Sequence, residues 1–298
     1  MIYKKLVEHL GEEKVLKNVP LKEHISFKVG GPCECMVFPS SAEDISAAVQ
    51  VCKAEGIPYY ILGNGTNVIA LDEGYKGVII KIGKLLGEIS REGNCLRAQS
   101  GVLLSNLSKK AYEYSLTGIE FAGGIPGSVG GGIMMNAGAY GGELKNVVKT
   151  VTALSKDGEI YTMDAADCEF EYRNSIFQKN GSIVLEAVFE LEEGDQEEIL
   201  AVMQDLSKKR TEKQPLNYPS AGSTFKRPEG HFAGKLIQDS GLKGICIGGA
   251  QVSELHAGFV INKGGASASD ILELIELVKN TVYDKYQVML HPEVRIIK

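Results

Sequence analysis

Apolar residues recur at helical spacing in several segments of this chain. The clearest segment follows Pro39, carries acidic residues in its first turn and closes at Gly56, which is the pattern of a capped helix. A second covers residues 103–116, just before Gly118. We expect further helices within residues 1–19 and over 196–210, 232–240 and 267–286, the last capped by Ser267 or Ser269.

Shorter segments rich in β-branched and aromatic residues lie between these helices and predict strands. Turn signals at Lys156-Asp157-Gly158 and at Asn180-Gly181 separate the expected strands 147–154, 159–163 and 183–191. Strands and helices follow one another without a regular alternation, so the pattern indicates an α+β fold. The expected strands cover residues 57–62, 68–70, 77–82, 147–154, 159–163, 183–191, 258–262 and 293–297.

The domain organisation is suggested by a change of composition at residues 192–198. This stretch is acidic and turn-rich, and a helical segment follows it. Boundaries between domains fall in such polar, exposed stretches, so we place one there. The expected organisation is an N-terminal helix in 1–19, a larger domain in 20–193 and a smaller domain in 194–298.

Composition and charge exclude several classes of function. The chain has 298 residues and a formal net charge of −6, without a stripe of lysine and arginine, so we expect no nucleic-acid partner. No apolar run reaches the roughly 18 residues of a membrane span. The first residues do not resemble a secretory signal, so we expect a cytoplasmic protein with no membrane insertion. The six cysteines lack paired metal spacing, and we expect reduced thiols and no metal site.

The most informative feature for chemistry is the glycine density of residues 121–143. Nine of these 23 residues are glycine, and none is Lys, Arg or Asp. Glycine is entropically costly in a folded chain and suits places where backbone must approach a ligand closely. Successive backbone N–H groups can bind a phosphate without net positive charge. The run therefore suggests a dinucleotide site.

A second glycine-containing loop, Gly63-Asn-Gly-Thr-Asn67, follows an expected strand. It lacks the third glycine of a Rossmann fingerprint and is followed by a strand rather than a helix, which disfavours a nicotinamide Rossmann domain. Asn-Gly is also a strong hairpin signal, so a simple turn is the alternative. Together with the glycine run, however, the loop can hold one pyrophosphate between two sets of N–H donors.

These motifs resemble the UDP-N-acetylenolpyruvoylglucosamine reductase family. The likeness extends from about residue 20 to the C-terminus. It includes both glycine loops and the motif Asn136-Ala-Gly-Ala-Tyr-Gly-Gly142. It continues in four further motifs, which are Glu171-Tyr-Arg-Asn-Ser-Ile-Phe177, Ser220-Ala-Gly-Ser-Thr-Phe-Lys-Arg-Pro228, Ala233-Gly-Lys-Leu-Ile-Gln-Asp-Ser-Gly-Leu-Lys243 and His291-Pro-Glu293.

The resemblance implies an FAD-binding module of two α+β subdomains, of the flavin oxidase type, followed by a smaller α+β substrate domain. It implies that NADPH reduces FAD, which then reduces an enolpyruvyl ether on a UDP-sugar in peptidoglycan precursor synthesis. No His or Cys stands at positions 61–70, so the flavin should be non-covalent. The matching FAD-binding positions are Gly63, Asn64, Gly65, Thr66, Asn67, Gly124, Ile125, Gly127 and Ser128.

Three residues match the catalytic positions of the family. Arg173 would stabilise charge on the substrate carboxylate, Ser223 would donate a proton, and Glu293 would act as a protonated carboxyl or polarise the enol. Each has a plain alternative. The arginine could pair with Glu169 or Glu171, the serine could bond its own turn, and the glutamate could be an exposed acid at a strand start.

The remaining assignments concern the substrate. Tyr172, Lys213, Lys226 and Arg227 are the expected contacts of the UDP diphosphate, with solvated surface charge as the alternative. His256 and His291 are expected to be structural. The segment between Gly244 and Asn262 is short, which places the chain in the class without the extra tyrosine-bearing loop.

Two other functions compete with this interpretation. The first is a flavin oxidase or dehydrogenase that acts on a hydroxylated small molecule, with oxygen as acceptor. The second is a nucleotide-sugar binding protein without catalysis. Reoxidation of the reduced flavin by the enolpyruvyl substrate, faster than by air, would distinguish the reductase from the oxidase. A purified protein without a flavin spectrum would favour the binding protein.

Overall fold

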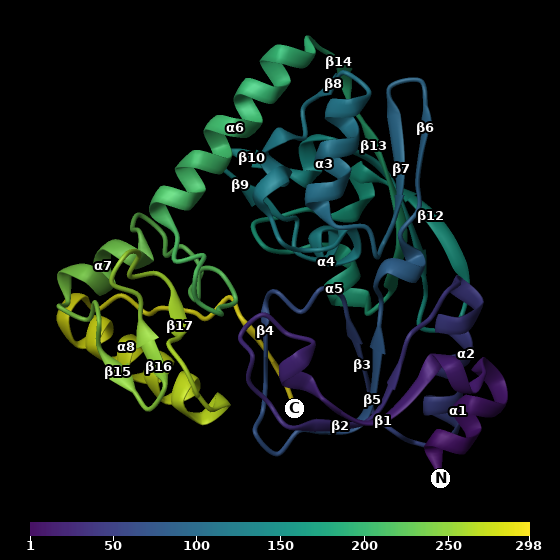
Figure 1. Cartoon of the computed structure of the whole chain (residues 1–298), viewed down its shortest axis with the longest axis horizontal. Helices are drawn as coiled ribbons and strands as arrows, with labels where there is room; N and C mark the ends of the chain where they lie inside the picture. Colours follow the sequence, from purple (N-terminus) through teal and green to yellow (C-terminus); the bar gives the residue numbers. More distant parts are fainter. The chain divides into compact units, whose positions relative to one another are not determined.

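Two compact units, each assembled from separate stretches of chain, make up this protein (Figure 1). The computed structural model describes residues 1–298. Unit 1 consists of Met1–Leu16, Cys35–Asn64 and Val78–Arg210. Unit 2 consists of Lys17–Glu34, Gly65–Gly77 and Thr211–Lys298. The domain boundary expected near residue 194 stays a prediction, because compact units need not be domains that fold independently.

The chain passes between the two units within three strands, β1, β2 and β5, of one four-stranded sheet. Its order is β1-β2-β5-β3, and β3 pairs with β5 in parallel, with Leu62 opposite Lys81. Strand β3 leads directly into the first glycine loop. Their bounds are β1 Val15–Pro20, β2 Pro32–Val37, β3 Tyr59–Leu62 and β5 Tyr75–Lys81.

A five-stranded antiparallel sheet forms the frame of unit 1. Its order is β12-β11-β13-β7-β6, and the predicted strands 147–154, 159–163 and 183–191 are confirmed as its first three members. The hairpin β6–β7 was not predicted, because its residues alternate only weakly between polar and apolar. The strands are β6 Ile89–Glu92, β7 Cys95–Gln99, β11 Val148–Leu154, β12 Ile160–Asp164 and β13 Ile183–Glu190.

Helices α3 (Leu104–Glu113) and α4 (Val129–Met134) share a hydrophobic core with this sheet. Leu104, Leu107 and Ala111 of α3 are spaced on one helical face, and all three are buried. The predicted helix 103–116 is shorter than expected, since Leu116–Thr117 form strand β8 and pair with β14 (Glu192–Glu193). Helix α4 lies inside the glycine run, where the sequence suggested only loop.

A second core of unit 1 forms around α1 (Ile2–Leu10) and α2 (Ala42–Ala54). Ile2, Leu6 and Leu10 recur at intervals of four residues and are buried. The expected helix within 1–19 is therefore confirmed only as far as Leu10, because glycine follows at position 11 and the chain then enters β1. The predicted helix 39–56 is confirmed as α2, with the Ser41 hydroxyl accepting from the Asp44 N–H.

The other elements of unit 1 are short, apart from its last helix. Helix α6 was predicted over 196–210 and extends three residues further, to Lys213. The short elements are 3-10 helices η1 Glu12–Lys14, η3 Lys84–Leu86, η4 Glu120–Gly124, η5 Leu144–Asn146 and η6 Ala165–Cys168, helix α5 Ile176–Asn180, and strands β9 Gly138–Ala139 and β10 Gly142–Glu143.

Unit 2 is built on α8 (Ala268–Tyr286), which packs against a three-stranded antiparallel sheet. The predicted helices 232–240 and 267–286 are confirmed, and Ser267 caps the second in a capping box with Asp270. Strand β18 (Arg295–Ile297) pairs in parallel with β4 (Val68–Ala70). The remaining elements are η2 Leu21–Glu23, α7 Ala233–Asp239, β15 Cys246–Ile247, β16 Ala250–Val252 and β17 Val260–Asn262.

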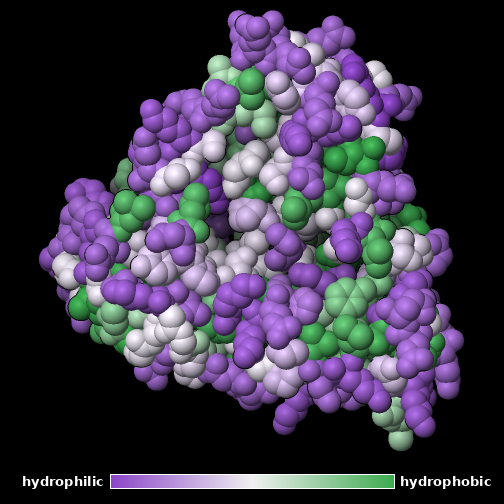
Figure 2. Space-filling view, in the orientation of Figure 1, coloured by the Kyte–Doolittle hydropathy of each residue, from purple (hydrophilic) through white to green (hydrophobic).

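Hydrophilic residues cover most of the face drawn in Figure 2, and apolar residues lie between them in small groups. A search for helices long and apolar enough to cross a membrane finds none. Four of the six cysteines, Cys33, Cys35, Cys52 and Cys168, are buried free thiols. They fill space in the core, as the sequence suggested.

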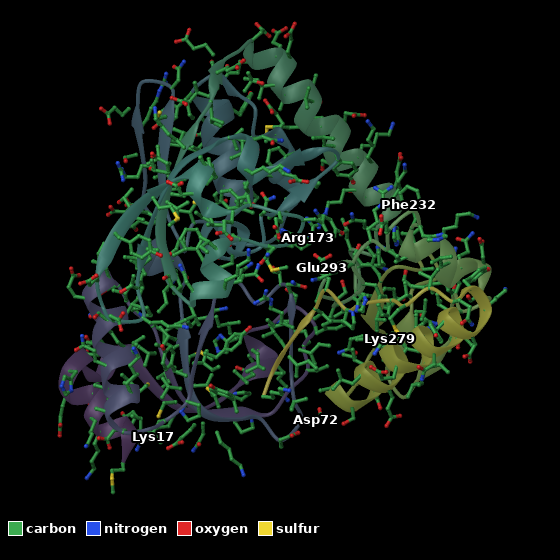
Figure 3. The ribbon with its side chains drawn as sticks, turned by 180° about the vertical axis from the view of Figure 1, so that it is seen from behind. Lys17, Asp72, Arg173, Phe232, Lys279 and Glu293 are labelled. Atoms are coloured by element: carbon green, nitrogen blue, oxygen red, sulfur yellow. The ribbon has the colours of Figure 1, made fainter.

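Asp72 ties the loop after β4 to the start of α8 within unit 2 (Figure 3). Its carboxylate accepts the backbone N–H groups of Ala268 at 2.8 Å and Ser269 at 3.0 Å, and the Ser269 hydroxyl at 2.9 Å. Burial alone would raise the pKa of Asp72, but these hydrogen bonds outweigh it and the pKa is lowered. The carboxylate therefore stabilises the helix start in its charged form.

We expect Asp72→Asn to lower the free energy of unfolding by about 1 kcal/mol at neutral pH, since solvent exposure weakens the effect. The pKa of Asp72 is lower in the folded protein, so its contribution is present above the unfolded value of about 3.9 and is lost as the pH falls through the folded value. Urea titrations at several pH values measure this. The control is Glu73→Gln, a neighbouring exposed acid, and an equal loss in both variants would contradict the capping role.

Candidate active site

The first glycine loop connects two strands that belong to different sheets. Strand β3, before the loop, pairs with β5, whereas β4, after it, pairs with β18. The hairpin alternative for Gly63–Asn67 is therefore wrong, because β3 and β4 do not pair with each other. The loop instead leaves unit 1 at Asn64 and enters unit 2 at Gly65.

Within unit 1, the start of this loop meets the second glycine run. The Asn64 Nδ2 donates to the Pro126 carbonyl at 2.6 Å. A Cβ atom at Gly63 would lie 2.8 Å from the Ser128 Oγ, so only glycine allows this approach without a shift. The sequence-based expectation that the two loops lie together is thus met for Gly63, Asn64 and Ser128.

The meeting point of the loops has unused hydrogen-bonding groups. The Ser128 Oγ is buried and has no hydrogen-bond partner. The backbone N–H groups of Asn64, Gly127 and Ser128 donate to no acceptor of the protein. Buried polar groups normally have partners, so the Ser128 hydroxyl indicates a ligand, and the N–H groups beside it are available to the same ligand. The phosphates of a dinucleotide fit this donor set.

Lys81 lies beneath the first loop, at the end of β5. Its Nζ donates to the Gly63 carbonyl at 2.6 Å. Burial lowers the pKa of this lysine to about 8. The residue thus anchors the loop, and sequence reasoning missed it because a lysine at a strand end is usually exposed.

Arg173 occupies a four-residue turn in unit 1 and adopts a left-handed backbone with φ of 57°. Backbone hydrogen bonds between Glu171 and Asn174 close the turn at 3.1 and 3.2 Å. Such a conformation is unfavourable for a residue other than glycine and persists where the surroundings enforce it. Strained backbone is typical of functional positions.

Three side chains hold this turn against the second glycine run. The Asn136 Nδ2 donates to the Glu171 carbonyl at 3.1 Å, and the Gln178 Nε2 donates to the Arg173 carbonyl at 3.2 Å. The Ser175 hydroxyl donates to the Met134 carbonyl at 3.0 Å. Asn136 is buried, so its amide acts as a fixed support. The turn that carries the arginine is therefore built onto the glycine run.

The immediate surroundings of the Arg173 guanidinium also belong to this region. It lies 5.1 Å from the Tyr172 ring centroid, and its Nη2 reaches the Gly138 carbonyl at 3.5 Å.

The alternative partners expected for this arginine make other contacts. Glu169 pairs with Lys179 at 2.6 Å, and Glu171 accepts from the Asn174 side chain at 3.0 Å. A different acid, Glu143, has its pKa lowered chiefly by a hydrogen bond from Lys145, with a smaller contribution from the charge of Arg173.

Unit 2 brings the other two predicted catalytic residues together. The Glu293 N–H donates to the Thr224 carbonyl at 2.8 Å, so the glutamate lies beside the residue that follows Ser223. Thr224 is buried, and its Oγ1 accepts the Val260 N–H at 3.0 Å. This hydrogen bond holds the segment of Ser223 and Thr224 against β17. The Ser223 side chain is exposed and makes no hydrogen bond within the protein, so the turn-serine alternative is not supported.

Asn67 joins this pair to the first glycine loop. Its Nδ2 donates to the Glu293 carbonyl at 3.3 Å, and its own carbonyl accepts the Arg295 N–H at 3.0 Å. Glu293 is half-buried rather than an exposed acid at a strand start. Residues 226 positions apart in the sequence are thus adjacent in unit 2.

The expected diphosphate contacts are less tightly organised. Lys226 and Arg227 are exposed and follow Thr224 along the same segment, where the Lys226 N–H donates to the His291 carbonyl at 2.8 Å. The Arg227 guanidinium lies 4.1 Å from the centroid of the Phe232 ring. Lys213 is exposed at the end of α6, and no contact joins it to these residues.

His256 has a structural role. Its Nδ1 accepts the Gly258 N–H at 3.1 Å, and its ring meets Phe259 edge-on at 5.0 Å between centroids. No group of three or more His, Cys, Asp or Glu side chains is arranged to hold a metal ion.

Two family models match the chain. The first is described as an FAD binding domain and matches residues 33–164. The second is described as the UDP-N-acetylenolpyruvoylglucosamine reductase C-terminal domain and matches residues 214–297. The first match contains both glycine loops, and the second contains Ser223 and Glu293.

Similar proteins cover nearly the whole chain. The UDP-N-acetylenolpyruvoylglucosamine reductase of Alkaliphilus oremlandii is 51% identical over 295 residues, which is 99% of this chain and 97% of that protein. The reductase of Clostridium novyi is 52% identical over 296 residues, or 99% of this chain and 96% of that protein.

Solved structures agree with the sequence relatives. The UDP-N-acetylenolpyruvylglucosamine reductase of Thermus caldophilus has a TM-score of 0.82 at 32% identity, over 96% of this chain and 98% of its own. Phl p 4.0202, a glucose dehydrogenase, has a TM-score of 0.52 at 14% identity over 65% of this chain and 44% of its own, a likeness of fold alone. The α+β fold with an FAD-binding domain is confirmed, and the chain belongs to the UDP-N-acetylenolpyruvoylglucosamine reductase family.

Proposed function

We propose that this chain reduces UDP-N-acetylglucosamine enolpyruvate to UDP-N-acetylmuramate with NADPH, through bound FAD, in peptidoglycan precursor synthesis. Family membership over 99% of the chain supports the reaction. The observation that carries the assignment of the chemistry is the adjacency of Glu293 to Thr224, and so to Ser223, next to Asn67 of the first glycine loop. An FAD-binding domain in the same chain favours a flavoenzyme over a nucleotide-sugar binding protein.

We infer that the paired glycine loops hold FAD without a covalent bond. The residues proposed to contact its phosphates and ribityl chain are those expected from the sequence. The unpartnered Ser128 hydroxyl and the unused N–H groups of Asn64 and Gly127 support this role. The proposed contacts are Gly63, Asn64, Gly65, Thr66, Asn67, Gly124, Ile125, Gly127 and Ser128.

The chemical demand on the site follows from the substrate. FAD held by the glycine loops would supply, in its reduced form, the hydride that adds to the vinyl carbon of the enolpyruvyl group. The adjacent carbon then needs a proton, and the carboxylate needs a cation while negative charge is delocalised into it. The protein must therefore present a fixed positive group and a proton donor.

Arg173 is the proposed cation. A guanidinium presents a planar fork that matches a carboxylate, and its charge persists at any working pH. The supports from Asn136 and Gln178 hold its turn in one conformation, so little reorganisation is needed when charge develops.

Ser223 is the proposed proton donor, and Glu293 the group that assists it. A serine hydroxyl is a weak acid, so it needs neighbours that stabilise the alkoxide or replace its proton. The Glu293 N–H donates to the carbonyl of Thr224, which is the residue after Ser223. A half-buried carboxyl can hold a proton and polarise the enol.

The remaining contacts concern the nucleotide part of the substrate. Tyr172, Lys213, Lys226 and Arg227 are proposed to bind the UDP diphosphate. The exposed charges of Lys226 and Arg227, close in sequence to Ser223, support this role. We further propose that the enzyme acts in the cytoplasm, where its buried thiols remain reduced.

The overall reaction predicts a specific order of colour changes. The purified protein should show a flavin spectrum that NADPH bleaches under anaerobic conditions. The enolpyruvyl substrate should then restore the oxidised spectrum much faster than air does, because the site is built for hydride transfer to that substrate. Stopped-flow absorbance measures both steps. Faster reoxidation by oxygen would favour the oxidase alternative.

Ser223→Ala should leave flavin reduction by NADPH intact and slow the second half-reaction by about 100- to 10,000-fold, because the proton donor is lost. The two half-reactions are measured separately by stopped flow. Ser220→Ala, a serine three positions earlier in the same loop, is the matched control. Equal slowing of both half-reactions in Ser223→Ala would argue against a proton donor.

Glu293→Gln should also preserve flavin reduction and slow the second half-reaction, since the amide keeps the backbone contacts but cannot supply a proton. The pH dependence of that step should change as well, because one titrating group is removed. Glu273→Gln removes the same charge from an exposed position on α8 and should have no effect. Normal turnover of Glu293→Gln would remove this residue from the mechanism.

A further inference from the structure

Arg210 is a half-buried cation that lies directly on the second glycine run. A Cβ atom at Gly124 would be 3.0 Å from its Cδ and 3.2 Å from its Nη1, so the guanidinium end covers the glycine backbone. Both residues belong to unit 1. Burial lowers the pKa of Arg210, and the nearby Tyr140 opposes this in part.

The protein offers this guanidinium no acidic partner. Arg210 forms no salt bridge, and no carboxylate contributes to its pKa. Its neighbour Lys209 differs, because it pairs with Asp205 at 2.6 Å on the exposed side of α6. Burying a charge without a partner is costly, so an anion from outside the chain would stabilise this half-buried guanidinium.

The position of Arg210 indicates which anion this is. Gly124 lies four residues before Ser128 in the second glycine run, and Ser128 meets Gly63 and has an unpartnered hydroxyl. This is the proposed FAD site, so the inference rests on the proposed function. We propose that Arg210 is the charge partner of bound FAD and supplies the localised positive charge that the backbone N–H groups lack.

FAD has two anionic parts that this planar fork suits. One is the diphosphate, which is charged in both redox states. The other is the N1–C2=O edge of the ring after reduction: a hydride from NADPH forms the N5–H bond, NADPH becomes NADP+, and the ring keeps one negative charge at that edge. Both present delocalised charge on acceptor atoms to a bidentate donor.

The test compares Arg210→Gln and Arg210→Lys with the wild type, and Lys208→Gln serves as the control, since it removes a charge from an exposed site on the same helix. Two quantities are measured, the affinity of the apoprotein for FAD and for ADP, and the midpoint potential of the bound flavin. We expect Arg210→Gln to weaken FAD binding by about 10- to 100-fold or to make the potential more negative. Arg210→Lys keeps the charge but not the fork, and should lie between.

The outcomes separate the two parts of FAD. Weaker binding of both FAD and ADP places the guanidinium on the diphosphate, whereas a more negative potential with unchanged ADP affinity places it on the reduced ring. Wild-type affinity and potential in Arg210→Gln would overturn the inference, as would a loss confined to the KM of the UDP-sugar. If the wild type itself bound no FAD, the proposed function would fail instead. Thermal melting of each apoprotein checks folding, and Arg210→Lys provides the test if Arg210→Gln does not fold.

Discussion

The parallel pairing of β18 with β4 is the contact on which the chemistry of unit 2 depends. It aligns Arg295 with Val68, the first residues of the two strands, so the segments that lead into β18 and β4 lie side by side. The first glycine loop ends there, and Glu293 lies there as well. The pairing of these strands, together with the hydrogen bond from the Asn67 side chain to the Glu293 carbonyl, gives Glu293 a fixed place relative to the end of the loop.

Unit 1 uses a different principle to place its functional groups. Its glycine run approaches Gly63 closely enough to exclude any side chain there, and the buried Ser128 hydroxyl has no hydrogen-bond partner. The same run carries Asn136, which supports the turn of Arg173. The same segment therefore meets the first glycine loop and supports the turn of Arg173, so the two proposed parts of the site are joined by a few hydrogen bonds.

Much of this arrangement could be predicted from the sequence. Helical periodicity located α2, α6 and α8, and the glycine and family motifs located the loops around Gly63 and Gly124. Short elements such as β6, β7 and α4 were missed, since tertiary contacts rather than local preference form them. Lys81 and Arg210 were also missed, because nothing in a sequence reveals that a lysine or an arginine is buried against a loop backbone.

The long separation between Asn67 and Glu293 has a consequence for how the enzyme is made. The ribosome adds about 5 to 20 residues per second, so the 226 positions from Asn67 to Glu293 take about 10 to 45 s to synthesise. During that time β4 lacks its partner strand β18, and the residue that Asn67 contacts has not yet been made. A chain that stops before position 293 therefore has the first glycine loop but lacks the glutamate that lies beside it in unit 2.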